Sequence, residues 1–284
     1  MAKFFRINLD KKHKSLIRYL GIPTILAVWC LVSLVARAML THANIILPSP
    51  WDVFLIDLPG FAAFWGHDGV AEQSSYGLAF LVLGKHSMIT ILRVLVGMAL
   101  GVFLGVGTAL VMGWSKTCRW LFDWPISLTR AIPTLALIPL FLLWFGGREI
   151  GNVIYITFSI FVILIVNALE AIRNVPPEYS QFASTLGATR GQIYKTVIIP
   201  AIVPGITGSI RVALGTAWAT TLGAEYLAVE VGLGKLLILS EMFFMTGRMV
   251  VIAILFGLYS TILNFLVVKV LRTFTKWLPE SSPA

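Results

Sequence analysis

Few residues in this 284-residue chain have the types and spacing that catalysis or metal binding requires. The four histidines share no ligand spacing, and no HExxH or GxSxG pattern occurs. The segment most similar to a phosphate-binding loop is "EVGLGKLL", residues 230–237. It lacks the first glycine and has Leu236 where a Mg²⁺-binding Ser or Thr should stand. We therefore expect no catalytic residue, no metal site and no bound cofactor in this chain.

Polar side chains inside an apolar segment are the next candidates, because their burial is costly without a function. Ser209, Thr216 and Thr220 are spaced at i, i+7 and i+11, which places them on one face of a helix. Such a face predicts a polar lining for a translocation pathway. Glu225 follows at the outer end of the same segment and is either a gate or lining residue or an acid that anchors the neighbouring loop.

Arg211 lies near the middle of that apolar segment, on another helix face. A charged side chain there costs roughly 2.5 to 3.5 kcal/mol, so it should face protein or water. Arg211 either supplies positive potential to an anion pathway or forms a structural ion pair with a carboxylate such as Glu170 or Glu225.

The composition identifies the protein class. Of all residues, 58% are hydrophobic and 12% are charged, and the mean hydropathy is +0.88. These values are typical of a polytopic membrane protein and not of a soluble domain. The net charge of +9 does not indicate nucleic-acid binding, because the basic residues stand at the ends of apolar runs.

About six apolar segments are long enough to cross a bilayer as helices, which predicts an all-α integral membrane fold. The expected spans are 17–40, 89–112, 120–146, 150–172, 202–222 and 248–271. The first is too long for a signal-peptide core, so we expect a retained anchor.

The distribution of Lys and Arg predicts the orientation. With a cytoplasmic N-terminus, the inside segments hold 15 Lys and Arg residues and the outside segments hold four. Both termini should therefore be cytoplasmic. We expect cytoplasmic tails at 1–18 and 273–284 around a membrane domain at 19–272. That domain should contain an external loop at 41–86, a cytoplasmic segment at 173–200 and a partly buried outer shelf at 223–247.

Two features of the second span are expected to be structural. Gly97, Gly101 and Gly105 form a row on one helix face that allows close approach of another helix, either within the chain or across a dimer. Arg93 lies about four residues into the span, close enough to the outer surface to extend its charge into water.

The cytoplasmic segment carries helix start and stop signals. Pro176 and Pro177 end the fourth span, and Glu178 suits a first helical turn. Gly187 is a natural end for a short helix at about 178–186, and Thr189 is a plausible N-cap for a second. Two short helices joined at Gly187 predict a compact surface with small residues.

This segment, "PPEYSQFASTLGATRGQIYKTVIIPAIVPGI", resembles the EAA loop of bacterial ABC importer permeases. The matching positions are Gln181, Phe182 and Ala183 for Glu-Ala-Ala, then Gly187, Val197, Ile199 and Pro200. "ILPSPWDVF", "TRAIPTLALIPLFLLWFG", "GSIRVALGTAWATTLGAEYL" and "GLGKLL" are similar to the subfamily that serves nitrate, bicarbonate, taurine and other aliphatic sulfonates.

The resemblance implies a type I ABC importer permease in the bacterial cytoplasmic (inner) membrane. Such a permease forms a homodimer or pairs with a paralogous permease, docks on cytoplasmic ATPase subunits that bind ATP and Mg²⁺, and receives substrate from an extracytoplasmic binding protein. The implied ATPase-coupling residues are Gln181, Phe182, Ala183, Gly187, Ala188, Thr189 and Arg190.

The implied substrate is a small anion: taurine or another alkyl sulfonate first, then nitrate, then bicarbonate. A stand-alone channel or ion-coupled carrier is the alternative, although the chain shows no inverted repeat or row of intramembrane acids to support it. A membrane enzyme would need an assembled polar site, which the sequence does not offer.

Overall fold

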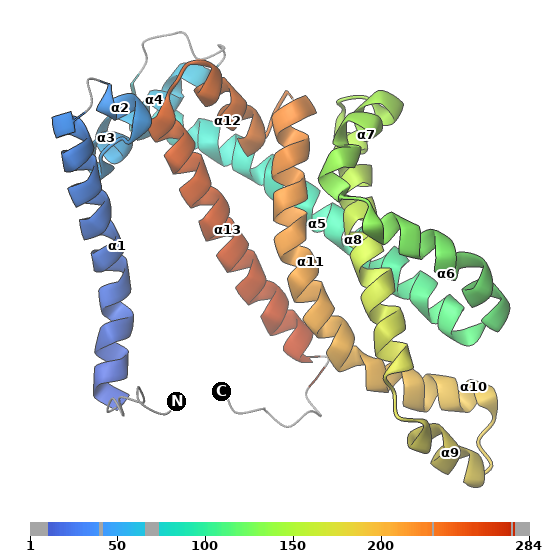
Figure 1. Cartoon of the computed structure of the whole chain (residues 1–284). Helices are drawn as coiled ribbons and strands as arrows, with labels where there is room; N and C mark the ends of the chain where they lie inside the picture. The colour runs from blue at the N-terminus through green and yellow to red at the C-terminus, as the bar shows by residue number, and fades with distance from the viewer. Residues whose placement is uncertain (1–10, 40–41, 66–73, 229, 274, 276–284) are drawn as a thin grey trace. The chain divides into compact units, whose positions relative to one another are not determined.

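The computed structural model describes residues 11–39, 42–65, 74–228, 230–273 and 275 (Figure 1). Every regular element in this part of the chain is helical, which confirms the all-α prediction. The main helices are α1 (Lys11–Met39), α5 (Tyr76–Trp114), α6 (Lys116–Ala131), α7 (Ile138–Phe145), α8 (Glu149–Arg173), α9 (Pro177–Thr185), α10 (Arg190–Ile193), α11 (Ile199–Ala228), α12 (Leu233–Met242) and α13 (Thr246–Thr273). The chain forms two compact units, residues 1–82 with 239–252 and residues 83–238 with 253–284.

In the part of the chain that the structure describes, five helices are long and apolar enough to span a membrane, or six if α6 and the helical segment Thr134–Phe145 count as one bent span. The expected third span, 120–146, is broken in the middle: α6 ends at Ala131, and the chain direction changes by 92°. Pro133 explains the break, because it disfavours helical backbone at Ile132, whose ψ of 123° is extended. A short 3₁₀ turn, η3 (Thr134–Leu137), leads into α7.

Several helix ends differ from the expected limits. Helix α5 begins at Tyr76 and has 39 residues, so the last part of the predicted external loop is helical. Helix α11 extends to Ala228, which shortens the predicted shelf, and α12 forms most of the rest. Charged and aromatic residues near these ends lowered the apparent hydropathy without stopping the helix.

Helix α5 packs closely against α8 in the larger unit. A Cβ added at Gly97, Gly101 or Gly105 would lie 2.5 to 2.9 Å from the side chain of Ile156, Ile160 or Leu164, respectively. The glycine row therefore packs against a helix of the same chain, which was the first of the two alternatives, the other being a dimer contact. Helix α8 also packs against α11 (Figure 1). The shared core includes Val94, Met98, Ile210, Ala213, Leu214 and Trp218.

The smaller unit contains α1, the start of α5, the end of α12 and the start of α13. It also contains the short helical turns α2 (Ala43–Ile46), α3 (Pro50–Asp52), η1 (Val53–Asp57), α4 (Leu58–Gly60) and η2 (Phe61–Phe64). Ser49 and Asp52 form a capping box at the start of α3, and Arg37 of α1 pairs with the same Asp52 carboxylate. The Arg248 guanidinium of α13 lies 6.0 and 5.3 Å from the ring centroids of Phe61 and Phe64.

Asp57 stands out electrostatically in the smaller unit. Partial burial raises the pKa of its carboxyl to about 6; the positive charge of Arg248 opposes the rise and the negative charge of Asp52 adds to it. Asp57 therefore changes charge in a pH range where ordinary aspartates stay ionised.

Candidate functional site

The predicted coupling segment contains one short helix, α9, and a defined turn after it. The expected second short helix is wrong, because α10 continues through residues 194–198 into α11 without a break. Helix α9 ends in a Schellman motif, because the amide of Ala188 donates to the Ala183 carbonyl at 3.1 Å and that of Gly187 to the Ser184 carbonyl at 2.9 Å. Gly187 has φ +80°, a conformation that favours glycine. The sequence signal at Gly187 thus predicted the correct end of the helix.

Helix α10 begins with a capping box. The Thr189 hydroxyl accepts from the Gln192 amide, and the Gln192 side-chain oxygen accepts from the Thr189 amide at 2.8 Å. The predicted N-cap is confirmed. The two turns give the segment a fixed shape before any partner binds.

Contacts with the end of α5 hold this segment in place. Tyr194 donates its hydroxyl to the Leu110 carbonyl at 2.5 Å, and Arg190 donates to the Trp114 carbonyl at 2.9 Å. The Arg190 guanidinium also lies 5.1 Å from the centroid of the Trp114 ring. Arg190, expected at a partner surface, thus holds the segment on its own permease.

Helix α9 exposes an apolar face. Tyr179, Phe182 and Leu186 are 57%, 68% and 74% exposed, and their i, i+3 and i+7 spacing aligns them. The sequence prediction included Phe182 and missed Tyr179 and Leu186, although the spacing was a usable signal. Gln181 is exposed, whereas Ala183 is half-buried. The result is a three-residue apolar surface on a polar helix.

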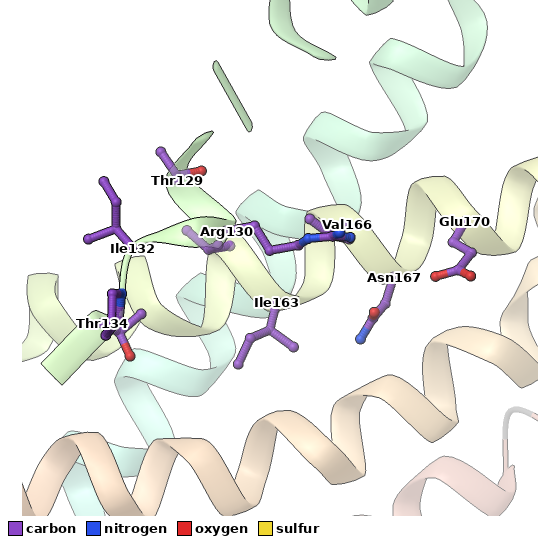
Figure 2. Close-up of a pocket in the computed structure, with 10 residues that line it drawn as sticks. Thr129, Arg130, Ile132, Thr134, Ile163, Val166, Asn167 and Glu170 are labelled. Atoms are coloured by element: carbon purple, nitrogen blue, oxygen red, sulfur yellow. The ribbon is translucent and has the colours of Figure 1, made fainter. Parts of the chain in front are cut away.

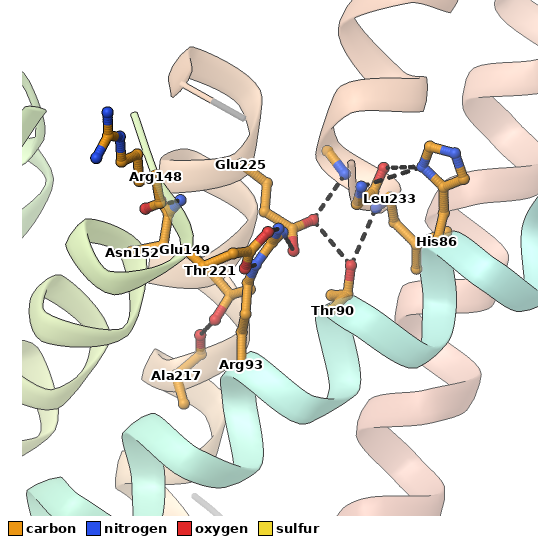
Figure 3. Close-up of polar contacts among 12 residues, drawn as sticks. His86, Thr90, Arg93, Arg148, Glu149, Asn152, Ala217, Thr221, Glu225 and Leu233 are labelled. Atoms are coloured by element: carbon orange, nitrogen blue, oxygen red, sulfur yellow. Dashed lines mark hydrogen bonds and ion pairs between the residues drawn. The ribbon is translucent and has the colours of Figure 1, made fainter. Parts of the chain in front are cut away.

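A buried ionic network occupies the larger unit near the start of α8 (Figure 3). Arg93 of α5 is 3% exposed, and its Nη1 lies 2.6 Å from Oε1 of Glu225 on α11. Its Nε lies 2.6 Å from Oε2 of Glu149, the first residue of α8. Arg93 therefore joins three helices. The expectation that it extends into water was wrong, because its side chain is buried and paired with the buried Glu225.

The same network fixes the start of α12. Glu225 Oε2 accepts from the Thr90 hydroxyl at 2.9 Å and from the Gly234 amide at 3.0 Å. Thr90 in turn accepts from the Leu233 amide at 3.0 Å. These contacts favour the alternative in which Glu225 anchors the shelf. They also account for the otherwise unbonded amides at the α12 N-terminus.

The other predicted pathway residues lie along α11. Thr220 is buried and donates to the carbonyls of Thr216 and Ala217, while Ser209 and Thr216 are half-buried. Arg211 is exposed, and no ion pair involving it occurs within the described ranges. The alternative that paired it with Glu225 was wrong, since Arg93 holds that carboxylate.

A cavity of about 370 Å³ lies between the end of α6, the helix break and α8 (Figure 2). Sequence reasoning did not find it, because the 92° bend creates it. Its polar lining is Thr129, Arg130, Thr134, Asn167 and Glu170.

With this geometry established, comparison with known proteins assigns the family. Residues 97–277 match the model of the family described as "Binding-protein-dependent transport system inner membrane component". The chain belongs to this family. It is therefore a multi-pass permease component of an ABC importer, and the resemblance noted in the sequence is confirmed.

Individual relatives agree with this assignment. The taurine transport system permease protein TauC of Escherichia coli is 33% identical over 56% of this chain and 58% of its own length. A second protein of Escherichia coli, SsuC, provisionally named an aliphatic sulfonates transport permease protein, is 30% identical over 90% of this chain and 89% of its own. The match to TauC covers less than two thirds of the length of TauC.

The fold has a counterpart among solved structures. The MetNI methionine ABC transporter in an inward-facing conformation matches with a TM-score of 0.57 and 16% identity. The match covers 69% of this chain and 97% of the other. At that identity it shows the type I importer permease fold alone.

Proposed function

We propose that this chain is the permease subunit of an ATP-driven importer for a small anion, with taurine or another alkyl sulfonate preferred over nitrate and bicarbonate. Two copies, or one copy with a paralogous permease, would enclose the pathway. An extracytoplasmic binding protein delivers the substrate, and cytoplasmic ATPase subunits supply ATP, Mg²⁺ and hydrolysis. Alternating access moves the substrate across the bilayer.

The observation that carries this proposal is the α9–α10 segment. A short helix with three aligned, exposed apolar side chains suits a groove in a partner protein, and its fixed turns lower the entropy cost of docking. The contacts of Arg190 and Tyr194 with the end of α5 would pass a movement of the segment to a membrane helix. Ser209, Thr216 and Arg211 would face the pathway between the two permease copies.

Co-purification with the co-encoded proteins tests this function. We expect an ATPase subunit to remain with the permease, and substrate uptake by the reconstituted complex to require ATP. A chain that runs alone and transports without ATP would be a channel or carrier instead. Gly187→Arg should abolish docking while membrane insertion persists, because a side chain is strained at φ +80°. An unchanged yield of the complex with the ATPase would show that the ATPase docks on another surface.

The proposed orientation is tested separately. In a variant without Cys30 and Cys118, a Ser184→Cys substitution on α9 should react with a membrane-impermeant thiol reagent only in inside-out vesicles. Labelling of intact spheroplasts would reverse the assignment of both termini to the cytoplasm.

A further inference from the structure

The cavity beside the helix break in the larger unit carries charges that the fold does not use. It is lined on one side by the end of α6 and on the other by one face of α8. Ile163, Val166, Asn167 and Glu170 form that face, because their spacing is i, i+3, i+4 and i+7. Figure 2 shows the Arg130 side chain extending over α8 toward Val166.

A second cavity of about 340 Å³ adjoins the first and shares Arg130, Val166 and Glu170 with it. The second cavity is also lined by Asp123 and Arg173, which form an ion pair with Arg173 Nη2 2.9 Å from Asp123 Oδ1. Arg130 and Glu170 are both exposed, and among the described residues their side chains take part in no ion pair or hydrogen bond. The fold thus pairs two of the four charges and leaves one of each sign facing the same space.

The place of the break is also consistent with an open cavity. Non-helical backbone within a membrane domain is tolerated where it is buried in protein or lines a water-filled cavity. Ile132, Pro133 and Thr134 form the break and are themselves part of the lining. The lining also contains the apolar side chains of Ile163 and Val166 and the amide of Asn167, which can both donate and accept.

We propose that this cavity binds a zwitterionic amino sulfonate during translocation, with the sulfonate at Arg130 and the ammonium at Glu170. The proposal rests on the proposed importer function and narrows its substrate class. A planar guanidinium binds a sulfonate oxygen pair well, and a carboxylate accepts from an ammonium. The short carbon chain of the ligand would lie against Val166, toward which Arg130 extends (Figure 2).

The charge pattern discriminates between candidate substrates. Nitrate and bicarbonate carry no positive group, so Glu170 would repel them while Arg130 attracts them. A zwitterion satisfies both charges at once. Taurine has this form, whereas propane-1-sulfonate has nearly the same shape with a methyl group in place of the ammonium.

The test uses the assembled transporter in nanodiscs without the binding protein, so that only the membrane domain can select. Isothermal titration with taurine and with propane-1-sulfonate should show roughly tenfold tighter binding of taurine. Glu170→Gln should weaken taurine roughly tenfold and leave propane-1-sulfonate unchanged or tighter. Arg130→Gln should weaken both, and the exchange of charges in the double variant Arg130→Glu, Glu170→Arg should restore part of the taurine binding.

Controls separate a local effect from a general one. Lys116→Gln and Glu230→Gln change exposed charges outside the cavity and should leave both titrations unaltered. Three results would overturn the proposal. They are equal affinity of the wild type for the two probes, equal loss of affinity for both probes in Glu170→Gln, and no binding of either probe to the wild type. ATPase stimulation by the loaded binding protein in the same preparation tests the importer function independently, since it can persist when the cavity assignment fails.

Discussion

Arg93 and Glu225 form an ion pair in which both side chains are almost completely removed from solvent, with exposed fractions of 2% and 0%. The second partner of Arg93, Glu149, is 60% exposed. The two halves of the network therefore differ: the bond to Glu225 is enclosed by protein, and the bond to Glu149 faces water. Loss of the Arg93–Glu225 pair should therefore reduce stability more than loss of the Arg93–Glu149 pair, because a buried charge left without its partner is costly.

We expect Arg93→Met to destabilise the protein by about 3–5 kcal/mol, since it leaves Glu225 charged and unpaired in the interior. Glu149→Gln is the matched control, and its cost should be about 1 kcal/mol or less because its side chain remains solvated. Thermal unfolding in detergent measures both. Equal losses in the two variants would contradict the division of the network into enclosed and solvated halves.

Two glycines on α5 make a second, internally controlled prediction. Gly101→Ala places a Cβ 2.6 Å from Cβ of Ile160 and 3.0 Å from the Thr157 carbonyl oxygen, so we expect a loss of about 1–3 kcal/mol. Gly107→Ala meets nothing within 4 Å and should stabilise by up to about 1 kcal/mol. Denaturant titration of both variants checks the difference, and a loss at Gly107 as large as that at Gly101 would place another helix on that face.

Asp57 gives a pH dependence with a defined sign. Its folded-state pKa of about 6 exceeds the ordinary value of 3.8, so between these values the folded state binds more protons than the unfolded state. Stability should therefore fall as pH rises from about 4 to 6. Asp57→Asn should flatten this part of the melting-temperature profile. A profile identical to that of the wild type would mean that other groups dominate.

Local signals in the sequence predicted those parts of the fold that depend on neighbouring residues. Gly187 and Thr189 predicted a helix end and a helix start correctly, since the caps are formed by residues three to five positions away. The row containing Gly101 predicted a close helix contact, and hydropathy located most of the spans.

What the sequence could not supply depends on distant residues. Arg93, Glu149 and Glu225 are 56 to 132 positions apart, and only the folded helices bring them together. The cavity likewise joins Arg130 of α6 to Glu170 of α8, although the 92° bend itself has a local cause at Pro133. Hydropathy averaged over the third span could not reveal that bend. The segments on either side of it, taken together, are as apolar as one continuous membrane helix.

Phe182 gives the last prediction, for the coupling surface on α9. Its side chain is 68% exposed and lies between Tyr179 and Leu186 on one helix face. Phe182→Ala should weaken the binding of the ATPase subunit by tenfold or more, since an aromatic anchor at the centre of an interface commonly contributes over 1 kcal/mol. Titration of the ATPase onto permease-loaded nanodiscs measures the dissociation constant.

Ser184→Ala is the matched control for that measurement. Ser184 is exposed on the same helix, but its hydroxyl donates only to the Ser180 carbonyl within α9, at 2.7 Å. Its removal should leave both the helix and the dissociation constant nearly unchanged. If Phe182→Ala binds as tightly as Ser184→Ala, the apolar face is not the docking surface. If both variants weaken binding equally, the contact depends on the fold of α9 and not on the aromatic side chain.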